Sequence, residues 1–261
     1  MNSKVFSDSV VGKIDRARHH LNALESEVRT FIESKPYEIR HEVNTDTKEK
    51  MVVFHPTRSI PSSLPYILGD LVHNLRSSLD HAVYELTLRH CGAPVKGSEF
   101  PVFVDRDHFQ RNAPRKICGL RDRTRTIIEQ LQPYNLRKGG ATESILWWLH
   151  QLSIIDKHCT IHLCWIQASE AQITFSRDVT FDSEKGITQF LARILKDGTV
   201  LASWFPAGVA DTQADTEVQI DIDIAMDETI VPNLAGQHIA GVAEQLIKCV
   251  EIVLRHLEGA E

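Results

Sequence analysis

The feature that most constrains this chain is one long helical pattern between Leu64 and Cys91. At about 100° per residue, its large apolar side chains and one alanine fall on a single face: Leu68, Leu71, Leu75, Leu79, Ala82 and Leu86. Gly92 and Pro94 follow, and such residues commonly stop a helix. We therefore expect one continuous helix that buries its leucine face.

The opposite face of this expected helix carries an unusual set of polar side chains. Lys and Glu, which usually cover exposed helix surface, are scarce on it. Instead it holds Asp70, His73, Asn74, Ser77, Asp80, His81 and Tyr84, with Arg76 at its edge. Such residues are mediocre helix formers, and they are often held by hydrogen bonds or directed at a ligand. Three interpretations stay open: an internal polar network, a ligand or catalytic site, and plain surface.

The remaining patterns predict an α+β protein. Helices are expected over 8–34, 142–158 and from Pro232 onward, and short ones near 105–112, 120–131 and 187–196. Because residues 142–158 are apolar nearly all round, we expect that helix to be buried. Strands are expected over 37–43, 51–55, 161–167, 171–176, 199–205 and 217–225. The predicted fold is a helical bundle with an inserted β-hairpin, followed by a small antiparallel sheet and a C-terminal helix that packs on the bundle. We expect residues 1–160, with the hairpin at 37–55, and residues 161–261 to form one compact unit.

Charge is unevenly placed along the chain. The net charge of −6 argues against indiscriminate binding to nucleic acid. Residues 106–138 nevertheless carry nine Lys or Arg against three Asp or Glu, and residues 208–229 carry seven acids and no base. The basic stretch is either a solvated, salt-bridged surface or a phosphate-binding rim that suits RNA. The candidate rim residues are Arg115, Lys116, Arg121 and Arg123.

Several classes of protein are disfavoured by what the sequence lacks. No apolar run approaches the roughly 20 residues of a membrane helix, and the first residues lack the apolar core of a secretory signal. We therefore expect no membrane partner and a cytoplasmic location. The five cysteines are scattered without a C-x-x-C. P-loop, G-x-G-x-x-G and G-x-S-x-G motifs are absent, so no cofactor is expected.

The segment Arg76-Ser-Ser-Leu-Asp-His81 resembles the R-x4–6-H motif of the HEPN (higher eukaryotes and prokaryotes nucleotide-binding) superfamily. Those domains are small helical bundles, and many are metal-independent endoribonucleases that act as dimers. The resemblance implies an RNA substrate, a homodimer, Arg76 as the phosphate-holding group and His81 as the proton-transfer group. Asn74, His73 and Asp80 are supporting candidates. Five positions on a straight helix rotate by about 140°, so Arg76 and His81 converge only with a distortion or a partner chain.

A wider resemblance covers LGDLVHNLRSSLDH, the Phe-Pro pair at 100–101, LQPY at 131–134 and DKH at 156–158. These segments are similar to a family of bacterial hypothetical proteins, which implies the architecture but no reaction. If the two most buried helices touch, Asp156 and His158 would meet the polar row and form a second candidate cluster. His158 and His162 have a spacing that can bind metal on a continuous helix. The sequence from 161 onward is strand-like, however, so no metal site is predicted.

Two functions follow from these observations. The first is a HEPN-like nucleic-acid-processing or defence protein that uses Arg76 and His81. The second is a non-enzymatic interaction protein whose polar row is an internal hydrogen-bond network. An open cleft at Arg76 and His81 would favour the first, and burial with full pairing would favour the second.

Overall fold

The computed structural model describes residues 6–136, 138–169, 172–175, 187–189, 194–205 and 216–260. The chain is α+β, as the sequence predicts. It divides into two compact units. The helical unit comprises Met1–Ser26, Ser62–His162 and Asp227–Glu261, and the sheet unit comprises Glu27–Pro61 and Leu163–Met226. The hairpin therefore groups with the later strands, and the last helix groups with the earlier helices.

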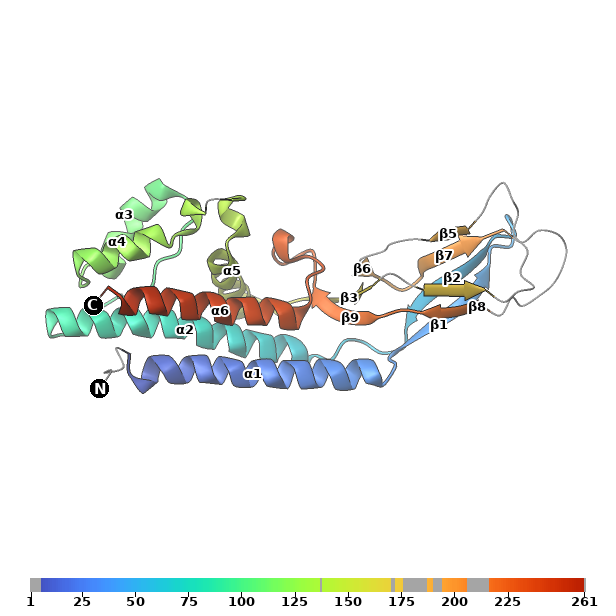
Figure 1. Cartoon of the computed structure of the whole chain (residues 1–261), viewed down its shortest axis with the longest axis horizontal. Coiled ribbons are helices and arrows are strands. Elements are labelled where there is room, and N and C mark those ends of the chain that lie inside the picture. Colours follow the sequence, from blue (N-terminus) through green and yellow to red (C-terminus); the bar gives the residue numbers. More distant parts are fainter. Residues whose placement is uncertain are drawn as a thin grey trace. The chain divides into compact units, whose positions relative to one another are not determined.

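The helical unit is built from long helices and several short ones (Figure 1). Its elements are α1 (Asp8–Glu33, which continues into the sheet unit), α2 (Ser63–Cys91), α3 (Arg106–Ile117), α4 (Asp122–Gln130), η1 (Pro133–Asn135), η2 (Ala141–Glu143), α5 (Ile145–His158), η3 (Pro232–Leu234) and α6 (Ile239–Glu258). Helices α5 and α6 both pack on α2 and on each other. The predicted packing of the C-terminal helix on the bundle is confirmed.

Helix α2 is continuous, as its leucine pattern predicts. Leu68, Leu71, Leu75 and Leu79 are completely buried. The helix ends at Gly92, which adopts a left-handed conformation (φ 72°) that favours glycine. The buried Ser78 hydroxyl donates to the Val10 carbonyl of α1 at 3.1 Å, so a polar group also ties α2 to α1. Packing of the buried face therefore fixes the position of α2 within the helical unit, and with it the polar side chains on its other faces.

Two details of the predicted helices were wrong. Helix α5 is not buried all round, because α2 and α6 cover only part of its surface and Ile154 stays 39% exposed. Pro232 opens the single-turn η3 instead of the final helix. The chain then turns at Gly236, whose φ is 69°, and α6 begins at Ile239. A left-handed residue cannot continue a right-handed helix, which explains this break.

The described residues of the sheet unit form three antiparallel sheets. Its strands are β1 (Tyr37–Val43), β2 (Lys50–Pro56), β3 (Leu163–Gln167), β4 (Gln172–Phe175), β5 (Ile187–Gln189), β6 (Ile194–Leu195), β7 (Thr199–Trp204), β8 (Thr216–Gln219) and β9 (Ile222–Met226). The sheet orders are β1-β2-β7-β5, β6-β3-β9 and β4-β8. The predicted hairpin over 37–55 is confirmed by the β1–β2 register, in which Ile39 lies opposite Phe54.

Two predictions for segments of the sheet unit were wrong. Residues 187–196 were predicted as a helix, but Ile187–Gln189 pairs with β7 and Ile194–Leu195 pairs with β3. A turn with Gly198 at φ 79° then leads into β7. Residues 217–225 are two strands instead of one, since β8 pairs with β4 and β9 pairs with β3. No helix of the described residues is long and apolar enough to cross a membrane.

Candidate functional site

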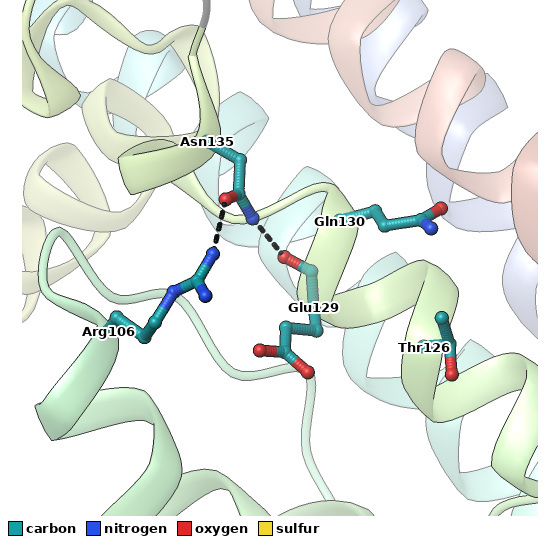
Figure 2. Close-up of a pocket in the computed structure, with 5 residues that line it drawn as sticks. All are labelled: Arg106, Thr126, Glu129, Gln130 and Asn135. Carbon is teal, nitrogen blue, oxygen red and sulfur yellow. Dashed lines mark hydrogen bonds between the residues drawn. The ribbon is translucent and has the colours of Figure 1, made fainter.

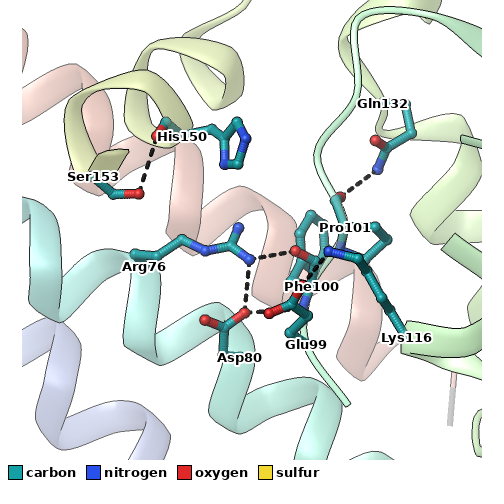
Figure 3. A network of polar contacts seen from close by, with 9 residues as sticks. All are labelled: Arg76, Asp80, Glu99, Phe100, Pro101, Lys116, Gln132, His150 and Ser153. Atoms are coloured by element: carbon teal, nitrogen blue, oxygen red, sulfur yellow. Dashed lines mark hydrogen bonds and ion pairs between the residues drawn. The ribbon is translucent and has the colours of Figure 1, made fainter. Parts of the chain in front are cut away.

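Arg76 and Asp80 of α2 together hold the backbone of Phe100 (Figure 3). Arg76 Nη2 donates to Asp80 Oδ1 at 2.8 Å and also to the Phe100 carbonyl. The Phe100 N–H donates to the same Asp80 oxygen at 2.9 Å. The Arg76 side chain is only 12% exposed and that of Asp80 is 31% exposed. Both polar groups of one loop residue are therefore bound by side chains one helical turn apart.

The buried Gln132 holds the next part of the same loop. Its Oε1 accepts from the Phe103 N–H at 2.9 Å, and its Nε2 donates to the Pro101 carbonyl at 2.9 Å. Nε2 also donates to the Ile128 carbonyl of α4 at 3.0 Å. The Phe-Pro segment is thus bound by α2 at Phe100 and by Gln132 at its following residues. The backbone N–H and carbonyl groups of this loop need hydrogen-bond partners. Residues of α2 and Gln132 supply them.

His150 of α5 completes this cluster beside the Arg76 guanidinium (Figure 3). Among the described residues, neither its Nδ1 nor Arg76 Nη1 has a hydrogen-bond partner, although both atoms are buried. Burial is the main cause that lowers the pKa of His150 to about 4. Positive charge on Arg76, Lys116 and Lys157 acts in the same direction. His150 is therefore neutral at pH 7.

We call Arg76, Asp80, Glu99, Lys116, His150 and Lys157 the α2–α5 site. Lys116 of α3 forms an ion pair with Glu99. Burial alone would raise the pKa of Glu99, but the Lys116 ammonium brings that pKa below its usual value. Burial raises the pKa of Asp80, against the opposing effect of Arg76. With His150 neutral, Arg76 and Lys116 balance the two carboxylates, and the exposed Lys157 adds one further positive charge nearby.

Asp156 of α5 contacts α2 at Gly69, about two turns before Arg76. Its side chain lies against Gly69, where an added Cβ would come within 2.0 Å of Asp156 Oδ1. Burial raises the pKa of Asp156, and the negative charge of Asp70 adds to this effect while His73 opposes it. Asp156 therefore approaches the polar row near Asp70 and His73. His158, the last residue of α5, is exposed.

The remaining polar residues of α2 point to other surroundings. His73 and Tyr84 are exposed, and Asn74 is partly buried. His73 Nε2 lies 3.4 Å from the Ser77 hydroxyl, and Asn74 Nδ2 donates to the Asp70 carbonyl at 2.7 Å. His81 is partly buried, and its side chain has no hydrogen bond or ion pair to another described residue.

The histidine that lies beside Arg76 is therefore His150, which was not among the candidates suggested by the sequence. A periodicity signal was available, since His150, Ser153 and Lys157 recur at spacings of three and four on α5. His150 lies among tryptophans and leucines, and the apolar pattern of this segment does not single out the histidine.

Some side chains of the basic stretch donate hydrogen bonds to carbonyl groups at the C-terminal ends of helices. Arg123 Nη2 donates to the Gly259 carbonyl at 2.8 Å, which satisfies a terminal carbonyl of α6. Arg125 donates to the carbonyls of Ile117 and Cys118 at the end of α3. Lys116 is paired with Glu99, and the side chains of Arg115 and Arg121 lie at the surface. The predicted rim residues thus have different surroundings and do not form one uniform basic face.

No group of three His, Cys, Asp or Glu residues in the described ranges could hold a metal ion. His162 lies beyond the end of α5, so His158 and His162 do not share a helix. Comparisons of the chain with models of protein families, with curated proteins and with solved structures gave no significant match.

Proposed function

We propose that the α2–α5 site binds a phosphate group of RNA and that the protein is a metal-independent, HEPN-like RNA-processing or defence protein. One observation carries the proposal: two buried nitrogen atoms, Arg76 Nη1 and His150 Nδ1, lack partners among the described residues within a cluster of net positive charge. Buried polar atoms without partners are uncommon in folded proteins and often mark a ligand or water position. A phosphate oxygen would satisfy the Arg76 donor and neutralise the excess charge.

The proposed chemistry uses His150 where the sequence suggested His81. Neutral His150 accepts the proton of a ribose 2′-hydroxyl, the 2′ oxygen forms a bond to phosphorus, and the bond to the 5′ oxygen breaks. Water supplies the proton that the leaving oxygen takes, and Arg76 Nη1 stabilises the charge on the phosphoryl oxygens. A bound phosphate opposes the effect of the surrounding cations, so it raises the pKa of His150 towards the range useful for proton transfer.

The test is cleavage of fluorescently labelled single-stranded RNAs of mixed sequence by the full chain in the presence of EDTA. We expect cleavage by the wild type and a loss of about 100-fold or more in His150→Gln, the usual range for removing a general base. His19→Gln, which changes an exposed histidine of α1, is the control and should retain activity. Equal melting temperatures would show that the variants fold.

His81→Ala separates the two assignments of the proton-transfer group. Loss of cleavage in His81→Ala with full activity in His150→Gln would support the motif pairing and overturn the role of His150. Inactivity of the wild type on all RNAs would contradict the whole proposal. The expected homodimer is tested on the same samples by light scattering.

The rim is tested by RNA affinity at two salt concentrations. Arg115→Ala should weaken binding and reduce its salt dependence, because the Arg115 side chain lies at the surface and bonds to no other element among the described residues. Arg123→Ala is the matched variant, since Arg123 is bound to the end of α6. Equal losses in both variants would argue against a specific rim.

A second candidate is a non-enzymatic interaction protein. It is favoured by the hydrogen bonds that Arg76 Nη2 already makes within the chain. That nitrogen and the Asp80 carboxylate already satisfy each other and Phe100. On this view the α2–α5 site is an internal network that shapes the surface of the helical unit. It predicts that every change at Arg76, Asp80 or His150 lowers stability and that the wild type has no measurable affinity for RNA.

A further inference from the structure

The helical unit also contains an open pocket with different lining residues (Figure 2). It has a volume of about 590 Å³ and is lined by Arg106, Thr126, Glu129, Gln130 and Asn135. These residues come from the start of α3, from α4 and from η1. The volume lies within the range of pockets that bind small molecules. None of these residues belongs to the α2–α5 site.

The guanidinium of Arg106 is held in place by two contacts. Its Nη2 donates to Asn135 Oδ1 at 3.3 Å, and its Cζ lies 5.5 Å from the centroid of the Tyr134 ring. Asn135 is itself fixed, since its Nδ2 donates to the Glu129 carbonyl at 2.7 Å (Figure 2). Arg106 is an exposed residue, and these two contacts orient its guanidinium at the pocket.

The pocket also contains a negative charge that does not neutralise this cation. Within the described part of the chain, the Glu129 carboxylate has no ion pair, and the contacts of the Arg106 guanidinium do not include it. A cation and a carboxylate thus line one pocket without pairing with each other. The hydroxyl of Thr126 and the amide of Gln130 add neutral hydrogen-bonding groups to the same lining.

We propose that this pocket binds a small zwitterion of the α-amino-acid class. The carboxylate of the ligand would pair with Arg106, whose planar fork suits it, and the ammonium would pair with Glu129. A lone anion such as phosphate would meet the repulsion of Glu129, and a lone amine would meet that of Arg106. Thr126 and Gln130 would contact the side chain of the ligand.

The test is calorimetric titration of the full chain with each of the twenty common α-amino acids. At least one should bind saturably, and acetate, methylammonium and inorganic phosphate should each bind at least ten-fold more weakly than it does. Arg106→Gln and Glu129→Gln should each weaken binding by ten-fold or more. Arg111→Gln is the control on the same helix, because that exposed side chain bonds only to the Asp107 carbonyl in the described structure.

Three results would overturn the proposal. They are the absence of binding by every amino acid, binding that both pocket variants leave unchanged, and phosphate binding as tight as that of the best amino acid. Circular dichroism spectra that match the wild type establish that the pocket variants are folded. RNA cleavage is not a readout of this experiment, so its outcome is independent of the function proposed for the α2–α5 site.

Discussion

Asp80 Oδ1 accepts hydrogen bonds from Arg76 Nη2 and from the Phe100 N–H, at 2.8 and 2.9 Å. One carboxylate oxygen therefore joins a helix side chain to a loop backbone. Removing it leaves the Phe100 N–H without an acceptor and leaves Arg76 Nη2 with the Phe100 carbonyl alone.

We expect Asp80→Ala to lower the free energy of unfolding by about 2 kcal/mol, because a mostly buried guanidinium then loses its partner. The matched control is Asp15→Ala, which breaks the Arg18–Asp15 pair of α1, whose side chains are 53% and 61% exposed. That exposed pair should contribute about 0.5 kcal/mol or less. Urea denaturation followed by circular dichroism measures both, and equal effects would contradict the role of Asp80.

His150 should make the protein less stable in acid. Its pKa is about 4 in the folded chain and near the ordinary histidine value of 6.5 in the unfolded chain. The unfolded state therefore binds more protons between these values, and stability falls as the pH drops from about 6.5 towards 4. The melting temperature should decline less over pH 7 to 5 in His150→Gln than in the wild type. Identical declines would show that His150 is not buried in its neutral form.

His55 of β2 should have the opposite pH dependence. Its Nε2 lies 2.9 Å from Glu42 and its Nδ1 lies 2.7 Å from Asp197, and these hydrogen bonds raise its pKa above 6.5. The resulting stability is present below pH 6.5 and is lost as the pH rises through the raised pKa. His55→Gln should lower the melting temperature at pH 5.5 and have little effect at pH 9. His41→Gln, an exposed position on β1, serves as the control.

A methyl group at Gly69 should require the Asp156 carboxylate to move. A Cβ at Gly69 would lie 2.0 Å from Asp156 Oδ1, whereas a Cβ at Gly12 of α1 would meet nothing within 4 Å. Gly12→Ala should therefore stabilise the chain by about 0.5–1 kcal/mol through helix propensity alone. Gly69→Ala should fall short of that gain in the wild type and recover it in Asp156→Ala. An unchanged effect of Gly69→Ala in both backgrounds would contradict the contact.

The sequence allowed the long helix α2 to be predicted because its leucines repeat over many turns and Gly92 ends it. The hairpin and β3, β4 and β7 followed from β-type runs between turn residues. Segment 187–196 could not be assigned correctly, since Ile187 and Leu195 take part in pairings with strands distant in the chain. Such tertiary pairing is invisible to local periodicity.

The candidate site was predictable where it depends on local helix patterns and was not predictable where it depends on tertiary contacts. Arg76, Asp80 and Asp156 stood out as polar residues on helices, and the approach of Asp156 to α2 followed from the expectation that two buried helices touch. The pairing of Asp80 with Phe100 and the place of His150 depend on the path of the loop and the rotation of α5. Neither is encoded in a motif spacing, so the motif pointed to His81 and nothing in the sequence singled out His150.

Arg76 and Asp80 bind the carbonyl and the N–H of Phe100, as the backbone of a neighbouring β-strand would do. They offer one acceptor and one donor at the spacing of a single peptide group, and Pro101 adds no N–H that would need another acceptor. The Phe100 backbone is therefore satisfied by α2, and a change that displaces Arg76 or Asp80 would leave its N–H and carbonyl without these partners.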